Sequence, residues 1–185
     1  MTAFLLRPIL GLYILFGSMV ASAATPTIPD IEVIDQDGKP HRLYTDLIKG
    51  NTVAVTFVYT SCKTSCPAMT GLFGAVQHKL QGESRRPVTL LSISIDPITD
   101  RPAQLQAVAK QFGAAPGWYF LTGSSPDVTR LLSAMDIGRS GLADHPSVIL
   151  IGNDRTGQWT RHYGLASVPM VMELIDSVGE SVVHQ

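Results

Sequence analysis

Cys62 and Cys66 are the only cysteines in the 185-residue chain, and three residues separate them. Thiol groups can attack a disulfide, close one or bind a soft metal ion, and the thiolate is the reactive form. Pro67 follows the second cysteine and suits the first turn of a helix, where its missing N–H costs nothing. We therefore expect Cys62 on a loop and Cys66 at a helix N-terminus, where the helix dipole favours the thiolate.

The spacing of the two cysteines leaves several kinds of chemistry open. A disulfide can close across it if the Cα atoms approach to about 6 Å. Both sulfurs can instead converge on one metal ion, and two thiolates select Cu(I) above all, and also Zn(II). A purely structural bridge would stabilise little, because the entropy that a cross-link removes grows with loop length. Thr60 and Cys62 resemble a peroxidatic setting only faintly, since the surrounding pattern is not that of a peroxiredoxin.

A metal site of this kind needs a third ligand, and histidine is the usual supplement to two cysteines. His145 is the best candidate, because it stands in the loop before a late apolar strand and that loop would lie beside the cysteines in a thioredoxin-like sheet. The other histidines have structural interpretations: His41, His78 and His184 as solvated residues, and His162 as a partly buried one.

The elements around the cysteines form a βαβ unit. We expect an apolar, β-branched strand over residues 53–59, a helix over 67–82 and a second apolar strand over 88–95. This order places the cysteines at a strand-to-helix turn, on the side where open α/β sheets bind their ligands.

The rest of the chain supplies a hairpin and a later half of the sheet. The hairpin is expected over 31–34 and 41–44, helices over 102–112, 125–135 and 168–178, and strands over 118–121, 147–151 and 158–163. This order predicts an α/β fold, a thioredoxin-like mixed sheet flanked by helices with an N-terminal β-hairpin. Met69 and Met135 recur at helical spacing and are expected in the core, not on a metal.

Residues 1–23 are interpreted as a secretory signal peptide. Arg7 precedes an apolar run from Ile9 to Val20, which is short for a membrane span of about 20 residues, and Ala21-Ser22-Ala23 fits a signal-peptidase site. Residues 24–185 are then a single exported domain, periplasmic, or held at the outer face of the inner membrane if the signal is not cleaved. The net charge of −1 provides no basic surface for nucleic acid.

Four stretches of the chain form an ordered set: FVYTSCKTSCPAM, SISIDPITDRPAQLQAVAKQFG, GWYFLTG, and ADHPSVILIGNDRTGQW followed by RHYG. In this order they resemble the Sco/SenC family of exported copper-binding proteins. The combination of CxxxCP with a distant Asp-His pair is specific, and the resemblance covers nearly all of the chain from about Ile31 onward.

The resemblance implies a thioredoxin-like domain that assists assembly of the dinuclear copper site of cytochrome c oxidase. The family's metal-binding cysteines fall on Cys62 and Cys66, and its ligand histidine falls on His145. Copper is therefore the expected metal, as Cu(I), Cu(II) or both. Asp96 and Asp144 would lie near the site without binding the metal. The expected partner is the copper-site subunit of the oxidase or another exported copper protein.

Three departures from the family pattern bear on these expectations. Lys63 replaces a proline that often follows the first cysteine, and its ammonium would favour thiolates. The connection from Met135 to His145 is short, whereas many members of the family carry a longer segment before the histidine, which is a natural docking surface for a partner. Pro146 follows His145 at about the place of the thioredoxin cis-proline, which keeps a redox function open.

Two functions follow from these residues. The leading prediction is a copper chaperone, not an enzyme in the strict sense, whose site is lost when the cysteines are oxidised. The alternative is a thiol-disulfide oxidoreductase that reduces cysteines of an exported client. In that case Cys62 and Cys66 are catalytic, either one being the attacking thiolate, and His145 is dispensable or tunes the thiols.

Overall fold

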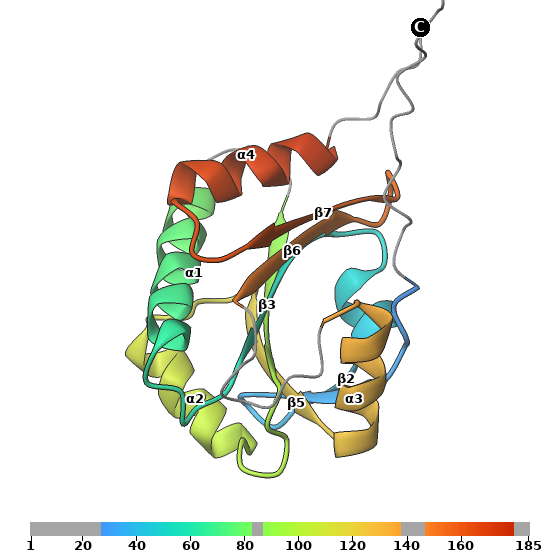
Figure 1. The fold of residues 1–185 in the computed structure, drawn as a ribbon, viewed down its shortest axis with the longest axis vertical. Coiled ribbons are helices and arrows are strands. Elements are labelled where there is room, and N and C mark those ends of the chain that lie inside the picture. Colours follow the sequence, from blue (N-terminus) through green and yellow to red (C-terminus); the bar gives the residue numbers. More distant parts are fainter. Residues whose placement is uncertain (1–26, 83–86, 138–146, 180–185) are drawn as a thin grey trace, which may run out of the picture.

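The fold is seen in a computed structural model that describes residues 27–82, 87–137 and 147–179 (Figure 1). There, seven strands form one sheet in the order β2-β1-β5-β4-β3-β6-β7. The strands are β1 (Glu32–Asp35), β2 (Pro40–Arg42), β3 (Thr52–Val58), β4 (Val88–Ser94), β5 (Trp118–Gly123), β6 (Val148–Asn153) and β7 (Gln158–Tyr163). The helices are the π-helix η1 (Leu43–Ile48), α1 (Ser65–Gln81), α2 (Pro102–Gln111), α3 (Ser125–Ala134) and α4 (Val168–Gly179). The predicted mixed sheet with its N-terminal hairpin is confirmed.

The parallel strands decide which face each helix covers. β3, β4 and β5 run parallel, and right-handed crossovers through α1 and α2 place both helices on one face. The chain then returns across the sheet through α3 to β6, so α3 lies on the opposite face (Figure 1). Phe73, Leu105 and Val171 therefore pack in one core, whereas Leu43 and Leu131 pack in the other.

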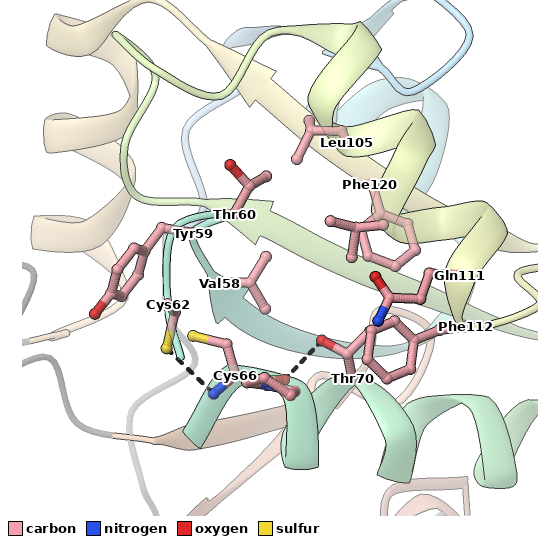
Figure 2. A pocket seen from close by; sticks show the side chains of 12 residues that line it. Val58, Tyr59, Thr60, Cys62, Cys66, Thr70, Leu105, Gln111, Phe112 and Phe120 are labelled. Atoms are coloured by element: carbon pink, nitrogen blue, oxygen red, sulfur yellow. Dashed lines mark hydrogen bonds between the residues drawn. The ribbon is translucent and has the colours of Figure 1, made fainter. Parts of the chain in front are cut away.

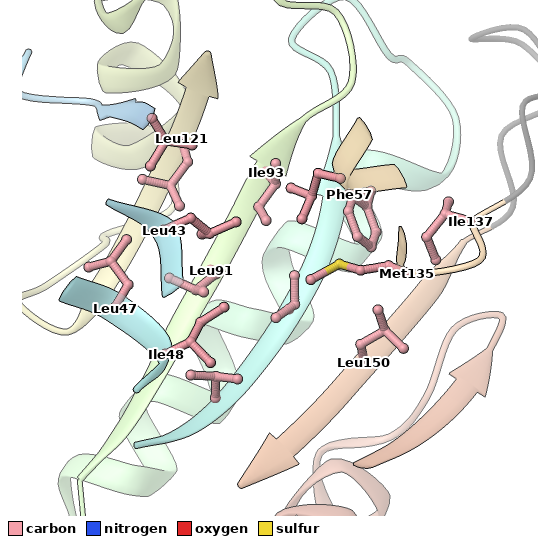
Figure 3. Packing of buried hydrophobic residues seen from close by; sticks show 14 of the residues in the cluster. Leu43, Leu47, Ile48, Phe57, Leu91, Ile93, Leu121, Met135, Ile137 and Leu150 are labelled. Atoms are coloured by element: carbon pink, nitrogen blue, oxygen red, sulfur yellow. The ribbon is translucent and has the colours of Figure 1, made fainter. Parts of the chain in front are cut away.

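Strand β3 lies inside the sheet, between β4 and β6, and its residues from Val53 to Val58 are buried. Val55 belongs to the core under α3, which Figure 3 shows, and Ala54 belongs to the core under α1. A strand buried on both faces is apolar at nearly every position, which explains the continuous apolar run in the sequence. Met69 and Met135 are buried in these two cores, as predicted. None of the described helices is long and apolar enough to cross a membrane, and the predicted signal segment 1–23 lies outside the described residues.

The hairpin corrects the prediction for His41. His41 is only 8% exposed, and its Nε2 lies 2.8 Å from Oδ2 of Asp35, so the prediction of a solvated residue is wrong. The buried carboxylate of Asp35 also accepts the backbone N–H groups of Asp37 and Lys39. The turn-forming sequence did not indicate this contact between His41 and Asp35, because it arises only when β1 and β2 pair as antiparallel strands. His78 is exposed and His162 is partly buried, as expected.

We predict that Asp35→Asn lowers the free energy of unfolding by about 1–3 kcal/mol at neutral pH, because a buried charged acceptor is lost. Burial raises the pKa of Asp35, but the bonds from His41, Lys39 and Asp37 outweigh it, so the pKa is lowered overall. The stabilisation is therefore complete above the ordinary carboxyl pKa of about 3.9 and is lost as pH falls through the folded-state pKa. In urea denaturation, the difference in the free energy of unfolding between wild type and Asp35→Asn should become smaller as the pH is lowered. An equal difference at neutral and acid pH would contradict this account. His78→Gln, an exchange of an exposed residue, is the control.

Candidate functional site

The two cysteines lie where β3 passes into α1, at the carboxyl edge of the parallel strands. Strand β3 ends at Val58 and α1 begins at Ser65, so Cys62 is on the connecting loop and Cys66 is in the first turn of the helix. Both thiols are free. Cys62 is buried, with 8% of its surface exposed, and Cys66 is half-buried. The sequence predicted this loop-and-helix placement correctly.

The sulfur of Cys62 takes the place of a helix cap. Thr64 is the N-cap residue of α1, and its side chain makes no capping bond. Instead, Sγ of Cys62 accepts the backbone N–H of Cys66 at 3.3 Å (Figure 2). The first N–H groups of a helix have no partner within the helix, and the positive end of the helix dipole points at any acceptor placed there. This position therefore stabilises a negative charge on the Cys62 sulfur.

The pKa of the Cys62 thiol is accordingly lowered to about 6. Burial acts against the shift, but it is outweighed by hydrogen bonds from the Cys66 thiol and from the backbone N–H groups of Cys66 and Thr64. The Thr64 hydroxyl also lies 3.7 Å from the sulfur. Cys62 is therefore largely a thiolate at neutral pH, which is the form that attacks disulfides and binds metals.

Cys66 behaves in the opposite way. Burial and its hydrogen bond to the Cys62 sulfur raise the pKa of the Cys66 thiol to about 12. The expectation that the helix dipole would make Cys66 the thiolate is therefore wrong, because the folded-back loop brings another sulfur to the helix N-terminus. At neutral pH the metal-free, reduced pair therefore carries one thiol proton, and that proton is on Cys66.

Tyr59 is a neighbour that sequence reasoning assigned only to the strand. A hydrogen bond to Cys62, burial and the charge on the sulfur raise the pKa of its phenol. Its ring stands beside the Cys62 side chain in Figure 2. An aromatic residue at the end of a buried strand gave no signal for this contact, since strands commonly end in such residues.

The carboxylate of Asp100 is hydrogen-bonded to Thr60, at the start of the cysteine loop. It accepts both the backbone N–H and the hydroxyl of Thr60, and also the hydroxyl of Ser94 at the end of β4. The aspartate expected near the site was Asp96, whose Oδ1 instead accepts the N–H of Thr99 within its own turn at 3.4 Å. The Asp-Pro motif drew attention to Asp96, although Asp100 in the same segment makes the connection.

A pocket of about 170 Å³ opens beside the cysteines, between α1 and α2 (Figure 2). Its wall is mostly apolar, with Leu105, Val108 and Phe112 from the α2 segment and Phe120 from β5. Gly74 allows the two helices to approach, since a Cβ there would lie 3.3 Å from the carbonyl oxygen of Phe112. The remaining lining residues are Val58, Tyr59, Thr60, Cys62, Cys66, Pro67, Thr70 and Gln111.

The expected third ligand, His145, lies outside the described residues, as do Asp144 and Pro146. Within the described ranges no three His, Cys, Asp or Glu side chains gather as a metal site would require. The described chain resumes at Ser147, whose carbonyl oxygen accepts the N–H of Gly164 at 2.8 Å. The next residues form β6, in which Ile149 pairs with Thr56 near the end of β3 that leads to the cysteines.

We predict that the ultraviolet absorbance of the thiolate rises with a midpoint at about pH 6 in the reduced protein. Cys62→Ser should abolish this transition, because burial, the largest cause, still raises the pKa of the remaining Cys66 thiol. Cys66→Ser should keep it, since a serine hydroxyl can replace the thiol donor and the backbone N–H still faces the sulfur. This measurement does not depend on how easily a reagent reaches the buried sulfur. A transition that survives Cys62→Ser would assign the thiolate to Cys66 and contradict the geometry.

Known proteins of the Sco type are similar to this chain in sequence and in structure. A "SCO1 protein homolog" of Bacillus subtilis (strain 168) is 38% identical over 92 residues, which span 49% of this chain and 46% of the relative, or about half of each. The solved structure of BsSco, a member of the Sco family of cytochrome c oxidase assembly proteins in which a disulfide switch was identified, is 28% identical. It matches with a TM-score of 0.68 and covers 86% of this chain and 97% of BsSco.

The fold alone extends to more distant structures. Arabidopsis thaliana ScoI, solved with copper bound, is 20% identical with a TM-score of 0.67, and the match covers 80% of this chain and 96% of ScoI. These similarities confirm the thioredoxin-like Sco fold predicted from the sequence. The SCO1/SenC family model matches residues 20–163, which include both cysteines, and the chain belongs to the SCO1/SenC family.

Proposed function

We propose that this protein is an exported copper chaperone that binds copper through Cys62, Cys66 and His145. Its cargo would pass to the copper site of cytochrome c oxidase or to a second exported copper protein. The observation that carries the proposal is the pair of free thiols, one of them a thiolate near neutral pH, at the carboxyl end of the parallel strands. Copper bound to Arabidopsis ScoI and the oxidase-assembly role of the BsSco family support the same metal and recipient.

The donor set fits copper. Two sulfur ligands select a soft ion, and a thiolate that is already formed at neutral pH needs no proton removed before it binds. Binding at the second sulfur would release the proton that Cys66 holds, so affinity should rise with pH. His145 would supply the third ligand. The described residue Ser147, which follows it closely, leads into β6 directly beside β3.

Oxidation of the cysteines would control the metal. A disulfide between Cys62 and Cys66 removes both thiolate ligands at once, so the oxidised protein would release its copper or fail to load it. With His145 as the third ligand that the family resemblance implies, copper affinity would also depend on this histidine. Export by the residue 1–23 segment, with or without cleavage, would place this cycle outside the cytoplasm.

We predict that the reduced protein binds one Cu(I) tightly in anaerobic competition with a chromophoric chelator. Cys62→Ser and His145→Ala should each weaken binding at least tenfold, which corresponds to about 1.4 kcal/mol. His78→Ala, on the exposed face of α1, is the matched histidine control and should bind as wild type does. Wild-type affinity in His145→Ala would reject the three-ligand site.

A second function is favoured by the unequal thiols and the adjacent pocket. The Cys62 thiolate would attack a client disulfide, forming a bond to one client sulfur and releasing the other. Cys66 would then lose its proton and attack the Cys62 sulfur, so that the second client thiol leaves. The client gains two electrons and two protons, and the protein is left with its own disulfide. The pocket between α1 and α2 gives a client segment access to the Cys66 side of the pair.

We predict a clear separation of the two functions by substitution. If thiol exchange is the main activity, Cys66→Ser should trap a mixed disulfide at Cys62, and His145→Ala should reduce a disulfide peptide at the wild-type rate. Mass spectrometry of the trapped species identifies the attacking cysteine. If the wild-type protein reduces the peptide no faster than a free dithiol at equal concentration, the thiol-exchange function is rejected.

A further inference from the structure

Asp100 is a buried carboxylate between the end of β4 and the start of α2. It is 1% exposed, and the residue after it, Arg101, is the N-cap of α2. Burial of a carboxylate is costly unless hydrogen bonds replace its water. Here the bonds come from hydroxyl and N–H groups of Ser94 and Thr60, which belong to two different segments.

The two hydroxyl bonds are short. Oγ1 of Thr60 lies 2.5 Å from Oδ1 of Asp100, and Oγ of Ser94 lies 2.6 Å from Oδ2. Hydroxyl-to-carboxylate hydrogen bonds of this length are shorter than the usual distance of about 2.7–2.8 Å between two oxygen atoms and belong to the strong class. The carboxylate therefore ties Thr60 firmly to the end of a neighbouring strand.

Thr60 is the point at which the cysteine loop leaves the sheet. The next turn is closed by the N–H of Cys62, which donates to the carbonyl oxygen of Tyr59 at 3.1 Å. Two residues beyond Thr60, the sulfur of Cys62 meets the N–H of Cys66 at 3.3 Å. The position of that sulfur thus depends on a short loop with one end fixed by α1 and the other by Asp100.

We propose that Asp100 is a positioning residue for the cysteine pair, which acts through Thr60 to hold the Cys62 sulfur against the N-terminus of α1. This clamp, the hydrogen bonds of Asp100 to Thr60 and Ser94, stabilises the dithiol because it holds the Cys62 sulfur on the N–H of Cys66. Without the clamp, the loop is free to bring the sulfurs into a disulfide. The inference rests on the cysteine pair being the functional site, as proposed above, and on neither copper nor a client protein.

The test is the metal-free equilibrium of the protein with glutathione. Oxidised glutathione takes two electrons from Cys62 and Cys66, with one proton from Cys66 and one from water, so one protein disulfide forms as two glutathione thiols are released. We expect Asp100→Asn to shift this equilibrium toward the protein disulfide by about tenfold, or about 30 mV. Far-UV circular dichroism checks that each variant is folded, and alkylation followed by mass spectrometry counts the oxidised fraction.

Asp35→Asn is the matched control. Asp35 is also a buried carboxylate that accepts several hydrogen bonds, but β5 and β4 separate its strand, β1, from β3, which leads into the cysteine loop. It should lower stability while leaving the glutathione equilibrium within twofold of wild type. An Asp100→Asn shift no larger than that of Asp35→Asn, or one toward the dithiol, would overturn the proposal.

Thr60→Val and Thr60→Ser keep the proposal testable if Asp100→Asn does not fold. The valine removes the hydroxyl donor and retains the shape and the backbone N–H, so a shift toward the disulfide of about threefold is expected. The serine restores the donor and should return the equilibrium to the wild-type value. Equal equilibria for valine and serine would overturn the role of Thr60. Because no copper is present, a failed copper titration would count against the proposed function alone.

Discussion

The hydrogen bond from the backbone N–H of Cys66 to the sulfur of Cys62 is the interaction on which the site depends. It places the first sulfur where a capping oxygen usually sits, at the positive end of α1. The contact lowers the pKa of the Cys62 thiol, while burial and the hydrogen bond to the Cys62 sulfur raise the pKa of the Cys66 thiol, so that two identical side chains become a thiolate and a proton-bearing thiol. Metal binding and thiol exchange both begin from this asymmetry.

The sheet provides the rigid frame for that contact. Strand β3 is an interior strand buried on both faces, and Val58, at which it ends, is held by its pairing with Ser94 of β4. Asp100 then extends the frame by two residues, from Val58 to Thr60, through its hydrogen bonds to Thr60 and Ser94. The loop that carries Cys62 is short, and its far end is the first turn of α1. A site made of loop residues can in this way be held by strand and helix ends.

Membership of the SCO1/SenC family and the geometry of the cysteines agree on the chemistry that the site could carry. A thiolate and an adjacent thiol suit a soft metal when reduced, and they form a disulfide when oxidised. A disulfide switch was identified in BsSco, which is 28% identical to this chain. One dithiol can thus serve as a metal ligand pair and as its own redox control, which links the two proposed functions.

The sequence by itself determined the strand, loop and helix around Cys62 and Cys66, the mixed sheet and the family, because periodicity, turn residues and ordered motifs are local properties. It also predicted that Met69 and Met135 are core residues. Only the tertiary structure decided that Cys62 is the thiolate, that His41 is buried against Asp35, and that Asp100 is bonded to the start of the cysteine loop. Each of these depends on which donors surround a group after distant segments pack together, and such neighbours are not encoded in local spacing.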